Sequence, residues 1–127
     1  MADIVLDASV VLAVIKGEPG QLQARAALAE GLLSAVNLSE VAAKLSDEGA
    51  DRGEIEAMLS LLPCQIAAFD QGQAITAGWL RAATKHKGLS LGDRACLALA
   101  LCAGLPILTA DRAWAELELG VDVRLIR

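Results

Sequence analysis

Four acidic residues of this 127-residue chain stand where an apolar segment passes into a helical one, and they could share one chemical task. Two directly follow apolar runs, and the other two fall in the first turns of predicted helices. In an open parallel sheet, the carboxyl ends of the strands and the helix starts beyond them share one edge, where a ligand crevice forms. We therefore expect these acids to converge in space: Asp7, Glu40, Asp93 and Asp111.

Clustered carboxylates repel one another and raise each other's pKa unless a cation neutralises them. A hard divalent ion with oxygen ligands resolves that repulsion, which makes Mg²⁺, or else Mn²⁺, the expected occupant. Such an ion activates a water molecule for attack on a phosphodiester without any nucleophilic side chain. Each acid taken singly also has a simpler explanation, because Asp7 and Asp111 suit helix N-caps. The spacings from Asn37 to Glu40 and from Ser90 to Asp93 likewise resemble capping boxes.

Hydroxyl and guanidinium groups lie beside these acids. Ser9 comes two residues after the first acid and Thr109 two before the fourth, so each hydroxyl could orient a carboxylate or a metal-bound water. Ordinary turn and strand chemistry explains them equally well. Arg94 and Arg112 each directly follow an acid, and the pair could hold phosphate at the rim of the site. Surface ion pairs are the alternative for the two arginines.

Composition excludes several other classes of protein. The length suits one domain, and no apolar run is long enough to span a membrane. Asp3 stands where a signal peptide carries positive charge, so we expect a soluble, cytoplasmic protein. The net charge of −5 and the aromatic content of 2% argue against coating nucleic acid or stacking bases. The three cysteines, odd in number and without CxxC spacing, favour small buried hydrophobes over disulfides or zinc.

The elements that must position the acids alternate between strand and helix. An α/β sandwich with a mostly parallel sheet is the expected architecture. Gly17 and Gly104 are predicted to end the helices at 8–15 and 90–103, Gly31 to cap the helix at 20–30, and Asn37 to open the helix at 37–48. Asp70 and Gln73 form a capping-box pattern. Strands are predicted at 3–7, 32–36, 65–69, 106–109 and 121–125, and helices at 8–15, 20–30, 37–48, 51–62, 70–85, 90–103 and 111–119.

Four sequence blocks, in this order and spacing, resemble PIN-domain ribonucleases of the VapC toxin type: IVLDASVVLAVIKGEPG, SAVNLSEVAAKL, LSLGDRACLALA and LPILTADRAW. The resemblance spans essentially the whole chain and implies a single PIN domain over residues 1–127, with a three-layer α/β/α fold. It also implies Mg²⁺- or Mn²⁺-dependent cleavage of RNA. The acidic quartet of the family corresponds to Asp7, Glu40, Asp93 and Asp111, and its hydroxyl positions to Ser9 and Thr109.

The resemblance further implies two protein partners. VapC toxins usually form homodimers and are held inactive by a VapB antitoxin, which threads a C-terminal segment across the site. Some relatives carry another acid shortly after the fourth one. Here Glu116 is the first acid available, which leaves the ligands of a second metal undefined.

Two other functions fit the sequence less well. A signalling receiver domain also binds Mg²⁺ in an α/β fold, but it needs paired acids after the first strand, where Asp7 stands alone. A module that only binds an antitoxin-like partner would be expected to have lost some of the acids by substitution, and all four are present.

Independently of family, we expect self-association, because the apolar segments 95–103 and 10–15 offer more apolar surface than one sheet face can cover.

Overall fold

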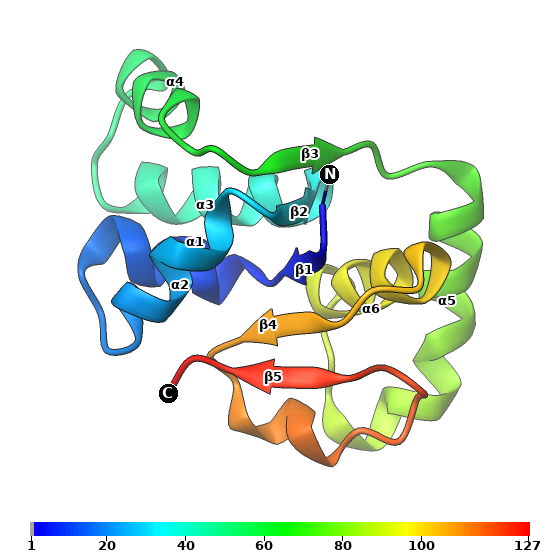
Figure 1. Cartoon of the computed structure of the whole chain (residues 1–127). Helices are drawn as coiled ribbons and strands as arrows, with labels where there is room; N and C mark the ends of the chain where they lie inside the picture. Colours follow the sequence, from blue (N-terminus) through cyan, green and yellow to red (C-terminus); the bar gives the residue numbers. More distant parts are fainter. Residues whose placement is uncertain (1) are drawn as a thin grey trace.

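Strands and helices alternate along the chain to build a parallel sheet with helices on both faces, as shown by the computed structural model, which describes residues 2–127 (Figure 1). The sheet order is β3-β2-β1-β4-β5, and every neighbouring pair is parallel. The predicted α/β architecture is therefore confirmed. The strands are β1 (Ile4–Leu6), β2 (Gly31–Ser34), β3 (Gln65–Ala67), β4 (Ile107–Thr109) and β5 (Val123–Leu125).

The strand order places a switch point beside β1. The chain runs outward from β1 through β2 to β3, then returns to add β4 and β5 on the other side of β1. Crevices for ligands form at the carboxyl ends of strands where the order reverses in this way. The ends of β1 and β4, at Asp7 and Thr109, meet at that point.

The helices are α1 (Ala8–Lys16), α2 (Gln21–Leu28), α3 (Ala35–Asp47), α4 (Arg52–Ser60), α5 (Gln71–Thr84) and α6 (Leu91–Ala103), with 3-10 helices η1 (Lys85–Lys87) and η2 (Arg112–Glu116). None of them, within residues 2–127, has the length and apolar character needed to cross a bilayer. The helix predicted at 111–119 is wrong beyond its first turn. Leu117 and Leu119 pack against the core while their neighbours face solvent, which is the period of extended chain.

Alternating side chains of the central strand divide the core in two. Ile4 and Leu6 of β1 pack with α1, α2 and α3, whereas Val5 packs with α5 and α6 on the opposite face. Residues 95–100 of α6 are all buried within the chain, and so are Val10 and Val11 of α1. The domain itself therefore covers the apolar surface of residues 95–100 and of Val10 and Val11, which the prediction assigned to self-association; residues 12, 14, 15 and 101 are half-buried.

Glycines mark helix ends as predicted at two places and not at a third. Gly17 and Gly104 end α1 and α6 in the left-handed conformation, each with φ of 67°. Gly31 does not cap α2, which ends at Leu28; it is the first residue of β2. A Cβ at Gly31 would lie within 3.0 Å of the Leu6 side chain, so close packing between β1 and its neighbour explains this glycine.

The helix α3 begins two residues earlier than predicted. Ser34 is its N-cap, and the Ser34 hydroxyl accepts a hydrogen bond from the Val36 N–H at 3.2 Å. Asn37 consequently lies inside the helix and does not open it, and the proposed capping box from Asn37 to Glu40 is wrong. The Asn37 side chain instead donates to the Glu40 carboxylate and to the Gly92 carbonyl.

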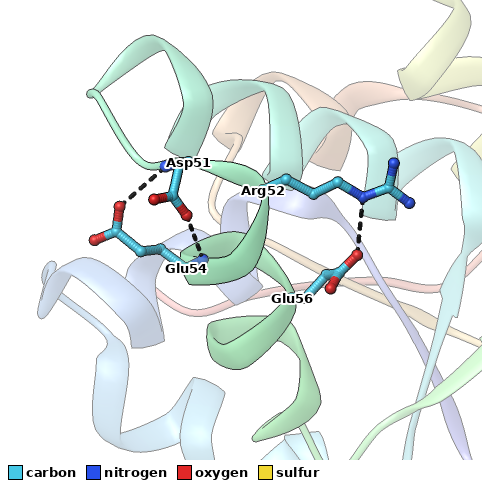
Figure 2. A network of polar contacts seen from close by, with 4 residues as sticks. All are labelled: Asp51, Arg52, Glu54 and Glu56. Carbon is cyan, nitrogen blue, oxygen red and sulfur yellow. Dashed lines mark hydrogen bonds and ion pairs between the residues drawn. The ribbon is translucent and has the colours of Figure 1, made fainter.

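Local polar contacts hold α4, which buries none of its residues (Figure 2). Asp51 accepts from the Glu54 N–H at 2.8 Å, and the Glu54 carboxylate accepts from the Asp51 N–H at 3.0 Å, which completes a capping box. Arg52 and Glu56 pair one turn apart at 2.9 Å. The capping box predicted at Asp70 is half formed, since the Gln73 side chain donates to the Ala68 carbonyl instead.

Candidate active site

The Asp7 carboxylate lies buried at the carboxyl end of β1, next to the switch point of the sheet. Asp7 is the N-cap residue of α1, yet its side chain makes no capping hydrogen bond. Its Oδ2 instead accepts from the Ser9 hydroxyl at 2.7 Å and from the Thr109 hydroxyl at 3.0 Å. Capping therefore does not explain the orientation of this side chain.

The two hydroxyls also connect the ends of β1 and β4. The Ser9 Oγ accepts from the Ala110 N–H at 3.0 Å, and the Thr109 Oγ1 accepts from the Asp111 N–H at 3.0 Å. Each hydroxyl thus donates to Asp7 and accepts from the segment after β4. These bonds define the position of Oδ2, and Asp7 Oδ1 takes part in neither of them.

The Glu40 carboxylate reaches the start of α6 with the help of two residues that the sequence reading did not assign to the site. The buried Asn37 amide donates to Glu40 Oε1 at 2.8 Å and to the Gly92 carbonyl at 3.0 Å. A Cβ at Gly92 would fall within 3.0 Å of three atoms of the Glu40 carboxyl group. A glycine in the first turn of a helix, where it weakens the helix, was the available signal for this close approach.

Asp93 combines a local role with a place beside the other acids. With Ser90 it forms the predicted capping box: the Asp93 Oδ2 accepts from the Ser90 N–H at 2.9 Å, and the Ser90 Oγ accepts from the Asp93 N–H at 3.1 Å. The charge of Asp93 also acts on both Asp7 and Glu40. The capping bond engages one oxygen of the carboxylate, so the two roles are compatible.

Burial and mutual repulsion raise the pKa values of two of these acids. For Asp7, burial raises the pKa most, the Ser9 and Thr109 hydrogen bonds oppose it, and the charge of Asp93 raises it further. For Glu40, burial again contributes most, the Asn37 hydrogen bond opposes it, and the charges of Asp7 and Asp93 raise the pKa. Three acids therefore share one electrostatic environment.

The pKa of the buried Cys96 thiol is affected by the same three acids. Cys96 is fully buried on α6, with its Sγ 3.8 Å from the Leu6 carbonyl. Burial and then the charges of Asp7, Asp93 and Glu40 raise the pKa of this thiol well above its usual range. All three cysteines are free; Cys64 is half-buried and Cys102 exposed, so the expectation of buried cysteines holds fully only for Cys96.

Asp111 lies at the rim and not among the other three acids. It is exposed, and its carboxylate accepts from the Ala113 N–H at 3.0 Å, which caps η2. Its charge is absent from the causes of the pKa shifts of Asp7 and Glu40. Its link to the cluster runs through its own N–H and the Thr109 hydroxyl.

The two arginines that follow acids in the sequence, Arg94 and Arg112, do not pair with those acids in the described residues. The Arg94 Nη1 donates to the Ala77 carbonyl of α5 at 2.8 Å, so this guanidinium is directed away from the acids. Arg112 is exposed and enters none of the ion pairs found in residues 2–127. Glu116 pairs with Lys87 at 3.3 Å. The structure therefore gathers Asp7, Glu40 and Asp93 but neither arginine.

The acidic cluster has the donor chemistry of a site for a hard divalent cation. No Lys or Arg pairs with any of the four acids in the part of the chain that the structure describes. Grouped carboxylates without a basic partner suit Mg²⁺ or Mn²⁺, which prefer oxygen ligands. Across residues 2–127, no group of three or more His, Cys, Asp or Glu side chains is arranged so that it could hold a metal ion. Asp7, Glu40 and Asp93 are thus within electrostatic range of one another but do not form a ready coordination site.

Comparisons with known proteins agree with this fold. The PIN domain family matches residues 4–119. A chain of the DNA-bound VapBC from Salmonella typhimurium has a TM-score of 0.81 and 20% identity, over 100% of both chains. A chain of a toxin-antitoxin complex from Klebsiella pneumoniae has a TM-score of 0.74 and 21% identity, over 98% of both. A chain of VapBC-5 from Mycobacterium tuberculosis has a TM-score of 0.63 and 24% identity, over 100% of this chain and 99% of that chain. Curated protein sequences give no match.

Proposed function

Because this chain belongs to the PIN-domain family, whose members are generally nucleases, we propose that it is a metal-dependent endoribonuclease acting as the toxin of a VapBC-type toxin–antitoxin pair. The observation that carries the proposal is the group formed by Asp7, Glu40 and Asp93. Burial raises the pKa values of Asp7 and Glu40 most, and the charge of Asp93 raises both further. None of the three acids has a basic partner among the described residues.

The four acids would hold Mg²⁺ or Mn²⁺. Asp7 and Asp93 are the proposed direct ligands, with Glu40 and Asp111 acting directly or through water. When bound there, the cation lowers the pKa of a water molecule and stabilises the negative charge that develops on the scissile phosphate. The exposure of Asp111 and its bond to the Ala113 N–H support a contact through water better than a direct one.

The residues around the acids position them. Ser9 and Thr109 hold one oxygen of Asp7, and Asn37 holds one oxygen of Glu40. No nucleophilic side chain is needed, and the nearby Cys96 thiol does not suit the role. It is fully buried, and burial raises its pKa, so both access and ionisation are disfavoured.

A VapB-like antitoxin is the proposed protein partner. Structural neighbours of this chain occur in VapBC and other toxin–antitoxin complexes. A negatively charged group of carboxylates suits a basic segment of such a partner, because opposite charge favours both encounter and binding. The same electrostatics would place that segment in competition with the metal and the RNA.

A homodimer is also proposed, on a different surface from the one the sequence suggested. Ile75 and Trp79 lie one turn apart on α5 and are 65% and 72% exposed. Large apolar side chains grouped on one helix face are typical of partner surfaces. Sedimentation at micromolar concentration should give a dimer, and Trp79→Ala should shift it toward monomer. A wild-type monomer would contradict the proposal.

Cleavage of an RNA oligonucleotide tests the proposed activity. We expect cutting with Mg²⁺ or Mn²⁺ and none in excess EDTA. Asp7→Asn and Asp93→Asn should each lower kcat/KM by at least about 100-fold, because several kcal/mol of transition-state stabilisation depend on the cation they hold. Asp47→Asn, which removes an exposed acid at the end of α3, is the matched control and should cut like wild type. Robust cutting in EDTA, or by both site variants, would refute the metal mechanism.

A further inference from the structure

We propose that the hollow between the end of α5 and the start of α6 binds a backbone phosphate of the RNA substrate. This inference rests on the proposed ribonuclease function and adds a substrate-binding subsite to it. The hollow has a volume of about 290 Å³. Its lining includes Arg81 and Lys85 from the end of α5 and η1, Ser90 from the N-cap of α6, and Arg94 from the first turn of α6.

The charged residues that line the hollow are all basic. Arg81, Lys85 and Arg94 line it, and no acidic residue does. None of these three cations enters an ion pair within residues 2–127, although four of the eleven Lys and Arg residues of the chain do. In a chain of net charge −5, three uncompensated cations around one hollow favour an anionic ligand.

Arg94 is oriented by a hydrogen bond to α5, and some of its N–H donors have no acceptor. Its Nη1 donates to the Ala77 carbonyl at 2.8 Å, which spans α6 and α5. Its Nε is buried and has no acceptor. A guanidinium has five N–H donors and binds phosphate in a fixed, often bidentate geometry. The structure thus holds a guanidinium in place with most of its donors unused.

Helix-dipole stabilisation alone does not explain this arrangement. Basic residues near the end of α5 suit the negative end of that helix, which accounts for Arg81 and Lys85 separately. Arg94 belongs to the first turn of a different helix, where a positive charge is disfavoured by the dipole. A shared anionic ligand accounts for all three.

The hollow adjoins the acidic site through two consecutive connections. Ser90 lines the hollow, and its N–H donates to the Asp93 carboxylate at 2.9 Å. Arg94 follows Asp93 directly in the sequence. Because Ser90 contacts both the hollow and Asp93, we take a phosphate of the same RNA strand, and not an isolated anion, as the occupant of the hollow.

A charge-matched pair of double variants tests the proposal. Arg81→Gln with Lys85→Gln removes two cations from the hollow. Arg25→Gln with Lys44→Gln removes two exposed cations from α2 and α3 that form no ion pair within residues 2–127. Binding of a short single-stranded RNA is measured in EDTA over a range of salt concentrations. Each lost phosphate contact makes the negative slope of log K against log salt shallower by about 0.7, so the slope of the Arg81→Gln, Lys85→Gln variant should be shallower by about 1.4. At 0.1 M salt this corresponds to about 25-fold weaker binding.

Steady-state cleavage with Mg²⁺ gives the second measurement. The hollow variant should raise KM far more than it lowers kcat, and the control should match wild type. Arg94→Lys keeps the charge but loses the planar, two-donor geometry, so we expect an intermediate KM. A third measurement records the melting temperatures of wild type and the two double variants with and without inorganic phosphate.

The outcomes separate this inference from the proposed function. If the chain cuts RNA and both double variants bind and cut alike, the subsite is refuted and the ribonuclease stands. If phosphate raises the melting temperature of wild type and control but not of the hollow variant, while RNA binding is equal in all three, the hollow is a small-anion site and the RNA assignment is overturned. If wild type neither binds nor cuts RNA, both proposals fail.

Discussion

Replacing Gly92 with alanine adds one methyl group where Glu40 reaches the start of α6. The added Cβ would lie within 3.0 Å of the Glu40 carboxyl carbon and both of its oxygens, whereas ordinary contact begins at 3.4 Å. The carboxylate is the end of a flexible side chain, so it will move and the helix will not. We therefore expect Gly92→Ala to displace Glu40 and to break its 2.8 Å hydrogen bond with Asn37.

The effect on stability should be small because opposing contributions nearly cancel. Alanine favours a helix over glycine by about 0.5–1 kcal/mol. Loss of a hydrogen bond to a charged group costs about 1.5–3 kcal/mol. The displaced carboxylate regains water and moves away from the charges of Asp7 and Asp93, which offsets part of that cost. We expect a free energy of unfolding within about 1 kcal/mol of wild type.

The effect on activity should be large. A shift of about 1 Å in a group that positions reactants can cost about 100-fold in rate, and the carboxylate must move by about that much. Cleavage of an RNA oligonucleotide with Mg²⁺ should therefore fall by about 100-fold while urea unfolding changes little. Gly78→Ala is the matched control, because a Cβ there meets nothing within 4 Å. It should be slightly stabilised and fully active.

A double variant identifies the route of the effect. In a Glu40→Ala background the clash is gone, so adding Gly92→Ala should cause no further loss of activity. Wild-type activity in Gly92→Ala would refute the positioning role of Gly92. Equal losses of activity from Gly92→Ala in both backgrounds would show that it acts on something other than Glu40.

Three further predictions concern the acids and the sheet. In EDTA, the free energy of unfolding should fall as pH rises from about 4 through the raised pKa of Asp7, because the folded state binds its proton more tightly than the unfolded state does. Asp7→Asn should flatten this pH dependence and raise Tm at pH 7; an unchanged pH slope would count against the buried charge. Mg²⁺ or Mn²⁺ should raise the Tm of wild type, because a cation at 100 times its Kd adds about 2.7 kcal/mol to the free energy of unfolding. The Tm of Asp93→Asn should rise much less; equal shifts in Tm would show that the ion binds elsewhere. Gly31→Ala should lower the free energy of unfolding by about 1–3 kcal/mol in urea, because its Cβ would crowd Leu6; a stability equal to that of Gly78→Ala would contradict this reason.

Local patterns in the sequence were sufficient for the order of the elements and for several of their ends. The alternation of apolar runs with helical segments predicted all five strands in sequence order. Gly17 and Gly104 were recognisable as helix ends, and Ser90 with Asp93 as a capping box, since each depends only on residues a few positions apart. The same patterns placed four acids at helix starts and strand ends.

Where the local reading failed, a distant contact decided the structure. Gly31 looks like a helix cap from its neighbours, but its role depends on the Leu6 side chain on the adjacent strand. Asn37 looks like the start of a helix, but its amide joins Glu40 to the Gly92 carbonyl, 55 residues away. Ser34, the true cap, sits within a stretch whose pattern also suits continued strand.

Tertiary structure alone decided which candidate residues meet. The sheet order places β4 beside β1, which brings the Thr109 hydroxyl to the Asp7 carboxylate across 102 positions of sequence. Arg94 and Asp93 are adjacent in the chain, yet successive residues of a helix project about 100° apart, so their side chains point to different sites. Residue type and spacing therefore identified which groups could do chemistry. Strand pairing and helix rotation decided which of them share a site, because those depend on the packing of the whole chain.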